Sequence, residues 1–103
     1  MNAEQKRYSV IIDAGAVKMM DTHLEFLSNV SIDAAEKLAD QIGKGISSLE
    51  LMPQRCPMFH TNGTIKNYRK LILGRYQIIF SIEEAISTVR VKYILDSRQN
   101  NQF

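Results

Sequence analysis

Residues 67–82 read NYRKLILGRYQIIFSI, and this stretch decides the fold. Two apolar runs rich in β-branched and aromatic side chains flank the pair Gly74-Arg75, a pattern typical of two strands joined by a tight turn. We predict strands over residues 65–73 and 76–82. A connection this short joins antiparallel neighbours, because a parallel pair needs a crossover of about a dozen residues or more.

A third strand is predicted over residues 86–96, after the polar turn at residues 83–85. Apolar and polar side chains alternate along the second and third strands, so one face of the sheet is apolar and the other is more polar. The same alternation groups Tyr93 with Val91 and Leu95 on the inward face. The residues expected on the open face are Gln77, Ser81, Arg90 and Lys92.

The first half of the chain predicts one strand and two helices. Residues 8–13 form a short β-branched and aromatic run, and apolar residues then recur at helical spacing over residues 16–30 and again from Ser31, a candidate cap, to Leu49. Gly43 and Gly45 weaken the second helix, so we expect them to mark a close approach to the sheet. The fold class is therefore α+β, in the order β-α-α-β-β-β. A helical hairpin packs on one face of a mainly antiparallel four-stranded sheet.

The composition describes one folded domain, residues 1–103, with a flexible tail at residues 99–103. At 103 residues, 45% hydrophobic and 23% charged, the chain is not low-complexity or disordered. Residues 1–52 carry five basic and eight acidic side chains, a net charge of −3. Residues 53–103 carry eight basic and three acidic side chains, a net charge of +5. This asymmetry favours an anionic partner for the basic half, either nucleic acid or an acidic protein segment.

Cysteine usage and hydropathy predict a cytoplasmic protein. Cys56 is the only cysteine, which excludes an internal disulfide framework and suits a reducing compartment. The chain shows neither a signal-peptide run at its N-terminus nor an apolar run of the roughly 18 residues that a membrane span requires. We therefore expect no membrane association.

Two kinds of catalytic site are disfavoured by the residue pattern. Cys56 and His60 share one loop, but no third group is placed to orient a nucleophile pair. With His23 they offer at most three nitrogen or sulfur ligands without a paired motif, whereas structural zinc takes four. We expect no metal and no cofactor.

The basic residues of the second half are the remaining candidates. Neighbouring strands lie about 4.8 Å apart, so cations on them can form one surface, although Arg69 and Lys70 must point to opposite faces. Such a surface could bind a nucleic-acid backbone or stabilise the charge that develops when a 2′-hydroxyl attacks a phosphodiester. It could equally serve only to keep an open sheet soluble. The candidates are Arg69, Lys70, Arg75, Arg90, Lys92 and Arg98.

The element order, residues 67–80 and the ending VKYILDSR at residues 91–98 resemble the RelE/ParE superfamily of bacterial toxins. The resemblance spans about Tyr8 to Asn100. It implies a small toxin of a type II toxin–antitoxin module, neutralised by a cognate antitoxin. One branch of the superfamily cuts messenger RNA at the ribosome without a metal, and another inhibits DNA gyrase.

Carried over residue by residue, the resemblance favours the ParE-like branch. Lys70 matches a strand lysine of the RNA cutters, and Arg98 matches the arginine after the last strand. Gln77, however, stands where the RNA cutters often carry an arginine, and residues 99–103 lack the His or Tyr that often acts as their general acid or base. Arg69 matches a strand arginine that is common in ParE-like members.

We therefore predict the toxin of a plasmid-stabilisation module that inhibits an essential target such as DNA gyrase. The residues predicted to bind the target are Arg69, Arg75, Gln77, Arg90 and Arg98. One alternative is a metal-independent, ribosome-dependent mRNA endonuclease with Arg98, Lys70 and Lys92 as its catalytic groups. A second alternative is a domain that binds the antitoxin but is not toxic.

Overall fold

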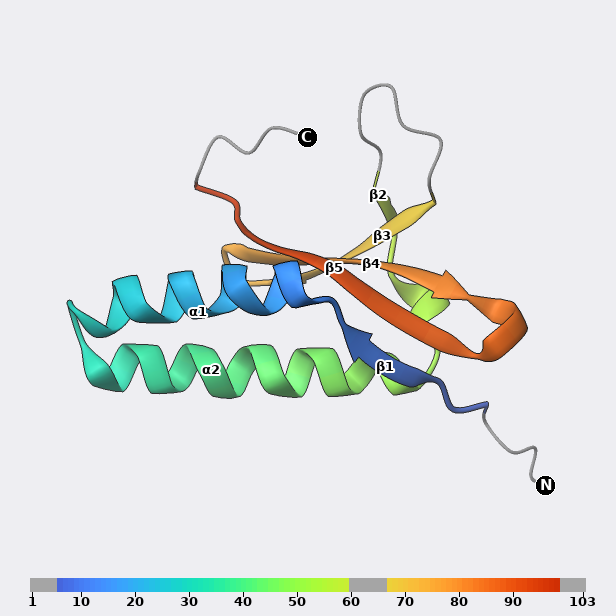
Figure 1. Ribbon diagram of the computed structural model, residues 1–103, viewed down its shortest axis with the longest axis horizontal. Helices are drawn as coiled ribbons and strands as arrows, with labels where there is room; N and C mark the ends of the chain where they lie inside the picture. The colour runs from blue at the N-terminus through green and yellow to red at the C-terminus, as the bar shows by residue number, and fades with distance from the viewer. Residues whose placement is uncertain (1–5, 60–66, 99–103) are drawn as a thin grey trace.

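The computed structural model describes residues 6–59 and 67–98, which form two helices and a single mixed sheet (Figure 1). The strands are β1 (Ser9–Ile12), β2 (Met58–Phe59), β3 (Tyr68–Leu73), β4 (Tyr76–Glu83) and β5 (Thr88–Asp96). The helices are α1 (Ala14–Ser28) and α2 (Ile32–Ser47). Short 3-10 turns at residues 48–50, 53–55 and 84–86 complete the described chain.

The sheet has the order β1-β5-β4-β3-β2, and both helices lie on the same side of it (Figure 1). All neighbours are antiparallel except β1, which pairs with β5 in parallel. The predicted α+β class and the helical hairpin are confirmed. The predicted count of four strands is wrong, because Met58 and Phe59 add a fifth strand opposite Arg69 and Tyr68. A strand of two residues is too short to produce an alternation pattern.

Beyond the end of β1, helix α1 lies along the edge of β5 and bonds to its backbone. The backbone N–H of Asp13 donates to the carbonyl of Val91 at 2.9 Å. Just beyond the middle of α1, His23 Nε2 donates to the carbonyl of Ile94 at 2.8 Å. The half-buried His23 therefore satisfies a backbone acceptor that a longer β1 would have bonded.

The main core lies between the sheet and the two helices. Helix α2 begins at Ser31, whose hydroxyl accepts from the Ala34 N–H at 3.1 Å, and it turns four apolar side chains toward the sheet. No helix in the described residues is both long enough and apolar enough to span a membrane. The buried side chains of this core include Leu38, Ile42, Ile46, Leu49, Ile78, Phe80, Val89, Val91 and Ile94.

A β-bulge in β5 overturns the expected orientation of Tyr93. Ile79 pairs with Tyr93 but the next residue, Phe80, pairs with Val91, so Lys92 is an extra residue in the ladder. Beyond such a bulge the side chains change face. Val91 lies in the main core, whereas Tyr93 packs on the opposite face of the sheet. The sequence prediction that Tyr93 turns inward with Val91 is wrong for this reason.

The two glycines of α2 differ in their surroundings. A Cβ built on Gly45 would lie 2.5 Å from Cδ1 of Leu73, so this glycine does allow the helix to approach β3. A Cβ on Gly43 would meet nothing within 4 Å. The predicted close approach is confirmed at Gly45 and wrong at Gly43.

Alanine at these two positions should therefore have opposite effects on stability. Gly43→Ala should raise the free energy of unfolding by about 0.5 to 1 kcal/mol, because alanine has less backbone entropy to lose. Gly45→Ala should lower it by about 1 kcal/mol, because Leu73 must move. Urea unfolding of the two variants measures both values, and equal stabilisation by both would contradict the close approach.

Candidate functional site

The face of the sheet opposite the helices carries most of the predicted site residues, and we call it the open face. Strand register places Lys70 next to Ile79, and Gln77 between Ile72 and Leu95, on this face. Tyr68, Ile79 and Leu95 are buried there in a small second cluster, with Tyr93 packed against them. The rings of Tyr68 and Tyr93 meet edge to face, with centroids 6.1 Å apart.

Arg90 and Lys92 lie on the open face as predicted, but carboxylates of the same chain hold both. Arg90 contacts Glu83 at 3.1 Å and Asp13 at 3.3 Å, and Lys92 Nζ lies 3.0 Å from the other oxygen of Asp13. The hydrogen bond from Lys92, helped by Arg90, lowers the pKa of Asp13 against a smaller opposing effect of burial. The two cations are therefore largely neutralised within the fold.

Arg98 is held in the same way at the end of β5. Its guanidinium lies 3.1 Å from Asp96, and its backbone N–H donates to the same carboxylate at 2.9 Å. Burial raises the pKa of Asp96, but the hydrogen bonds and charge of Arg98, together with the charge of Arg75, outweigh it and leave the pKa lowered. The side chain of Asp96 is only 6% exposed.

A pocket of about 380 Å³ adjoins this ion pair on the α1 side of the sheet. The guanidinium of Arg75 lies 5.5 Å from the ring centroid of Tyr76, which lines the pocket, and the carbonyl of Arg75 accepts from the Ser97 N–H at 2.6 Å. Sequence reasoning missed that α1 contributes to this site. The pocket is lined by Thr22, His23, Phe26, Tyr76, Asp96 and Arg98.

Lys70 differs from the other cations of the open face. Its Nζ lies 6.0 Å from the Phe59 ring centroid, and no described carboxylate forms a salt bridge with it. Lys92 lies two strands away, at a separation of about 10 Å. Arg98 belongs to the pocket on the helix side. The fold thus does not gather Lys70, Lys92 and Arg98 around one point.

Arg69 points away from the open face, toward the same side as Leu71 and the helices. Its Nη1 donates to the carbonyls of Gln54 and Cys56 at 3.1 and 2.7 Å. These bonds tie β3 to the segment after α2. Target contact by Arg69 remains a prediction, and the geometry gives this side chain a structural role.

The remaining sequence candidates are not brought together as a site. Cys56 is buried in the main core, where burial raises the pKa of its thiol, and His60 lies outside the described residues. Within residues 6–59 and 67–98, no three His, Cys, Asp or Glu side chains gather closely enough to hold a metal ion.

The family model described as "ParE toxin of type II toxin-antitoxin system, parDE" matches residues 10–101. The chain belongs to the ParE toxin family. This match confirms the superfamily resemblance and covers both the open face and the Arg98 pocket. No curated protein sequence matches the chain.

Solved structures of toxin–antitoxin proteins share the fold of this ParE-family chain. A chain of the chromosomal ParDE system from P. aeruginosa has a TM-score of 0.67 at 15% identity, covering 86% of this chain and 95% of that one. A chain of the RelBE2 complex from Mycobacterium tuberculosis has a TM-score of 0.61 at 11% identity, covering 92% and 97%. A chain of the archaeal RelE–RelB complex from Pyrococcus horikoshii OT3 has a TM-score of 0.53 at 16% identity, covering 88% of this chain and 96% of that one. At these identities the likeness shows the fold alone.

The lowered pKa values of Asp13 and Asp96 predict a specific acid sensitivity for the ParE-family chain. A carboxyl with a lowered pKa in the folded state stabilises the fold above its unfolded value of 3.8. This contribution is lost as the pH falls through 3.8 toward the lower folded pKa. We expect the free energy of unfolding, measured by urea titration, to decline from about pH 5 downward.

Asp96→Asn tests the source of that decline. It should lower the free energy of unfolding at neutral pH by about 1 kcal/mol and flatten the acid decline, since Arg98 loses its charged partner. Asp21→Asn removes the same charge from an exposed site on α1. It should change the free energy of unfolding at neutral pH by less than about 0.5 kcal/mol. An unchanged acid profile in Asp96→Asn would contradict the assignment.

Proposed function

We propose that this ParE-family chain is the toxin of a plasmid-stabilisation module that arrests growth by inhibiting DNA gyrase. Gyrase inhibition places its action in the cytoplasm. The observation that carries the proposal is the neutralisation of the candidate cations: Asp13 and Glu83 hold Arg90 and Lys92, and Asp96 holds Arg98. Such a surface suits recognition of another protein, where paired charges set orientation and specificity.

The same observation disfavours the metal-independent endonuclease. RNA cleavage requires preorganised cations at the point where phosphate charge develops. Here Arg98 lies on the helix side of the sheet, away from Lys70 and Lys92 on the open face, and both Lys92 and Arg98 are bound to carboxylates. Gln77 also presents a neutral amide on the open face where the RNA cutters often carry an arginine.

A cognate antitoxin is the second part of the proposal. The open face offers Lys70, which forms no salt bridge with a described carboxylate, beside Ile72, whose exposure is 57%. An acidic, apolar segment that orders on binding fits this combination. The neighbouring structures from P. aeruginosa, M. tuberculosis and P. horikoshii are described as toxin–antitoxin systems or complexes, which supports an antitoxin partner here.

Expression and supercoiling assays test the proposal together. Inducible expression in a bacterium should arrest growth, and co-expression of the small neighbouring reading frame should restore it. The purified chain should inhibit DNA supercoiling by purified gyrase, and a translating extract should show no new mRNA cuts.

Two results would redirect the assignment. Cuts in a translating extract that disappear in Arg98→Ala would establish the endonuclease instead. Complex formation with the neighbouring gene product, without growth arrest at confirmed expression, would identify an antitoxin-binding domain that is not toxic.

Two neighbouring residues on opposite faces of β3 offer a matched comparison. Arg69→Gln should lower the melting temperature by several degrees, because two backbone carbonyls lose their donor. Lys70→Gln should leave the melting temperature unchanged while weakening antitoxin binding, because it removes a cation from the open face. Thermal unfolding and a binding titration read the two effects separately, and the reverse pattern would refute the assignment of the faces.

A further inference from the structure

The pocket beside Arg98 has the size and lining of a site for a small organic molecule. Its volume of about 380 Å³ lies within the range of about 300 to 1,000 Å³ that is usual for such sites. Its walls come from α1, from the start of β4 and from the end of β5. Three of its lining side chains carry aromatic rings, and the others are Thr22, Asp96 and Arg98. Rings with a few polar groups among them are typical of ligand pockets.

The three rings give the pocket a fixed wall and an exposed one. Tyr76 is buried and meets the ring of His23 edge to face, with centroids 5.3 Å apart. His23 is itself held by its bond to the carbonyl of Ile94 at 2.8 Å. Phe26, by contrast, is 67% exposed, so much of its ring is open to another molecule. A planar apolar group can therefore pack against Phe26 inside the pocket.

The guanidinium of Arg98 uses only part of its hydrogen-bonding capacity within the fold. Asp96 accepts from its Nε at 3.4 Å and from one terminal nitrogen, Nη2, at 3.1 Å. The other terminal nitrogen, Nη1, donates to none of the described residues, and the side chain is 55% exposed. A guanidinium carries five N–H donors in one plane. The edge formed by its two terminal nitrogens can therefore bind a second carboxylate while Asp96 keeps the first edge.

A buried hydroxyl lies beside this guanidinium. Tyr76 is 6% exposed, and its hydroxyl forms no hydrogen bond with residues 6–59 or 67–98. The pKa of Arg98 is raised chiefly by the hydrogen bond to Asp96 and further by the charge that Tyr76 carries when it is ionised, so the phenol is close to the guanidinium. An oxygen bound at Arg98 could accept from this hydroxyl as well.

The charges around the pocket favour a ligand with a single negative charge. Arg75 and Arg98 supply two positive charges against the one negative charge of Asp96, and the guanidinium of Arg75 lies 5.5 Å from the Tyr76 ring centroid. A carboxylate carries one negative charge and balances this excess. A phosphate monoester carries about −1.5 to −2 at pH 7 and exceeds it.

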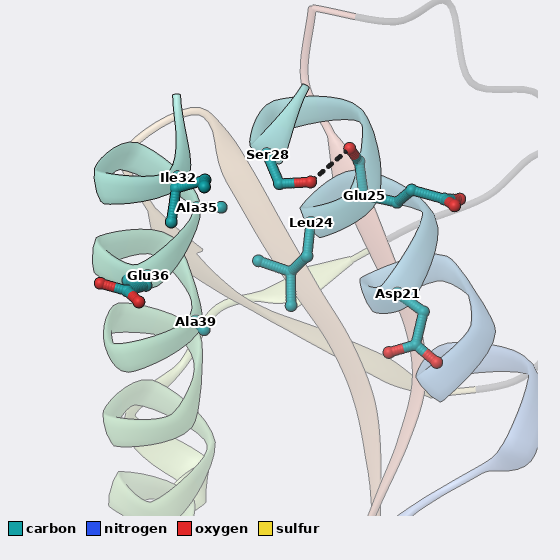
Figure 2. A pocket seen from close by; sticks show the side chains of 8 residues that line it. All are labelled: Asp21, Leu24, Glu25, Ser28, Ile32, Ala35, Glu36 and Ala39. Atoms are coloured by element: carbon teal, nitrogen blue, oxygen red, sulfur yellow. Dashed lines mark hydrogen bonds between the residues drawn. The ribbon is translucent and has the colours of Figure 1, made fainter. Parts of the chain in front are cut away.

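The groove between α1 and α2 provides a contrast within the same molecule (Figure 2). It has a volume of about 570 Å³ and opens broadly to solvent. Its lining includes the carboxylates of Asp21, Glu25 and Glu36 but neither a cation nor an aromatic ring. These carboxylates repel an anion, so we expect an anionic ligand at Arg98 and not in this groove.

We propose that the Arg98 pocket binds a small aromatic carboxylate. The carboxylate accepts from the unused edge of the Arg98 guanidinium and from the Tyr76 hydroxyl, and the aromatic ring packs against Phe26. This site lies apart from the open face, where the antitoxin is proposed to bind. It therefore adds a small-molecule ligand to a chain whose other proposed partners are proteins.

Titration of the full chain with phenylacetate tests the site. Proton–nitrogen correlation spectra should show saturable shifts of the backbone amides of residues 22–26 and 94–98. The dissociation constant should be on the order of 1 mM, as expected for so small a probe. Amides of residues 32–39, in the α1–α2 groove, should not shift. Phenylacetamide, which has the same shape without the charge, should bind at least about ten-fold more weakly.

Four variants locate the ligand. Arg98→Lys keeps the positive charge but loses the planar fork, and it should weaken phenylacetate binding by about ten-fold. Tyr76→Phe removes only the hydroxyl and should weaken binding by about five-fold while the melting temperature stays unchanged. Phe26→Ala should also weaken binding by about five-fold. Ile32→Ala, at a residue equally exposed at 67% but outside the pocket, should leave binding unchanged. The same spectra verify that each variant is folded.

Several outcomes would overturn the proposal. These are equal binding of phenylacetate and phenylacetamide, no saturable shifts at millimolar phenylacetate, shifts confined to other parts of the chain, or full binding by a folded Arg98→Lys chain. Tighter binding of phenyl phosphate than of phenylacetate would overturn the choice of a carboxylate. None of these readouts depends on gyrase or on the antitoxin, so their failure is distinguishable from failure of the function proposed above.

Discussion

Asp13 is the residue on which the arrangement of this fold depends. It stands where β1 ends and α1 begins, and its backbone N–H completes the parallel pairing by donating to Val91. Its carboxylate then reaches across the open face to Arg90 and Lys92 at 3.3 and 3.0 Å. One residue thus fixes the position of α1 along β5 and neutralises two cations of the basic half. The β-bulge at Lys92 belongs to the same region, because the extra residue brings the lysine beside this carboxylate.

That local arrangement changes the meaning of the charge distribution. The basic half of the chain carries a net of +5, which from sequence favours an anionic partner. In the fold, an acid from the first half and two acids from the second bind three of the candidate cations. Fixed ion pairs of this kind orient a partner more than they attract a polyanion. The paired charges therefore support the proposed protein interface over a site for a phosphate backbone.

The elements could be predicted from sequence where one local rule sufficed. Alternation placed Gln77, Ser81 and Arg90 on the open face, and helical spacing found both helices to within about two residues. The bulge could not be predicted, because its signal lies in the register between β4 and β5 and not in either strand alone. The Asp13 ion pairs, which join residues 77 and 79 positions apart, depend on the parallel placement of β1. The Asp96–Arg98 pair joins residues only two positions apart, but the sequence analysis did not predict it.

The two sides of the molecule differ in how their charges are used, and this difference follows from topology. Strand β1 lies beside β5, so Asp13 at the end of β1 forms ion pairs with Arg90 and Lys92. The helical hairpin turns its apolar stripes toward the sheet, and Asp21, Glu25 and Glu36 line a groove between the two helices. No described cation of the sheet forms a salt bridge with these three carboxylates. An acidic helical surface therefore remains beside a sheet whose charges are largely paired, and the fold presents two surfaces of different character.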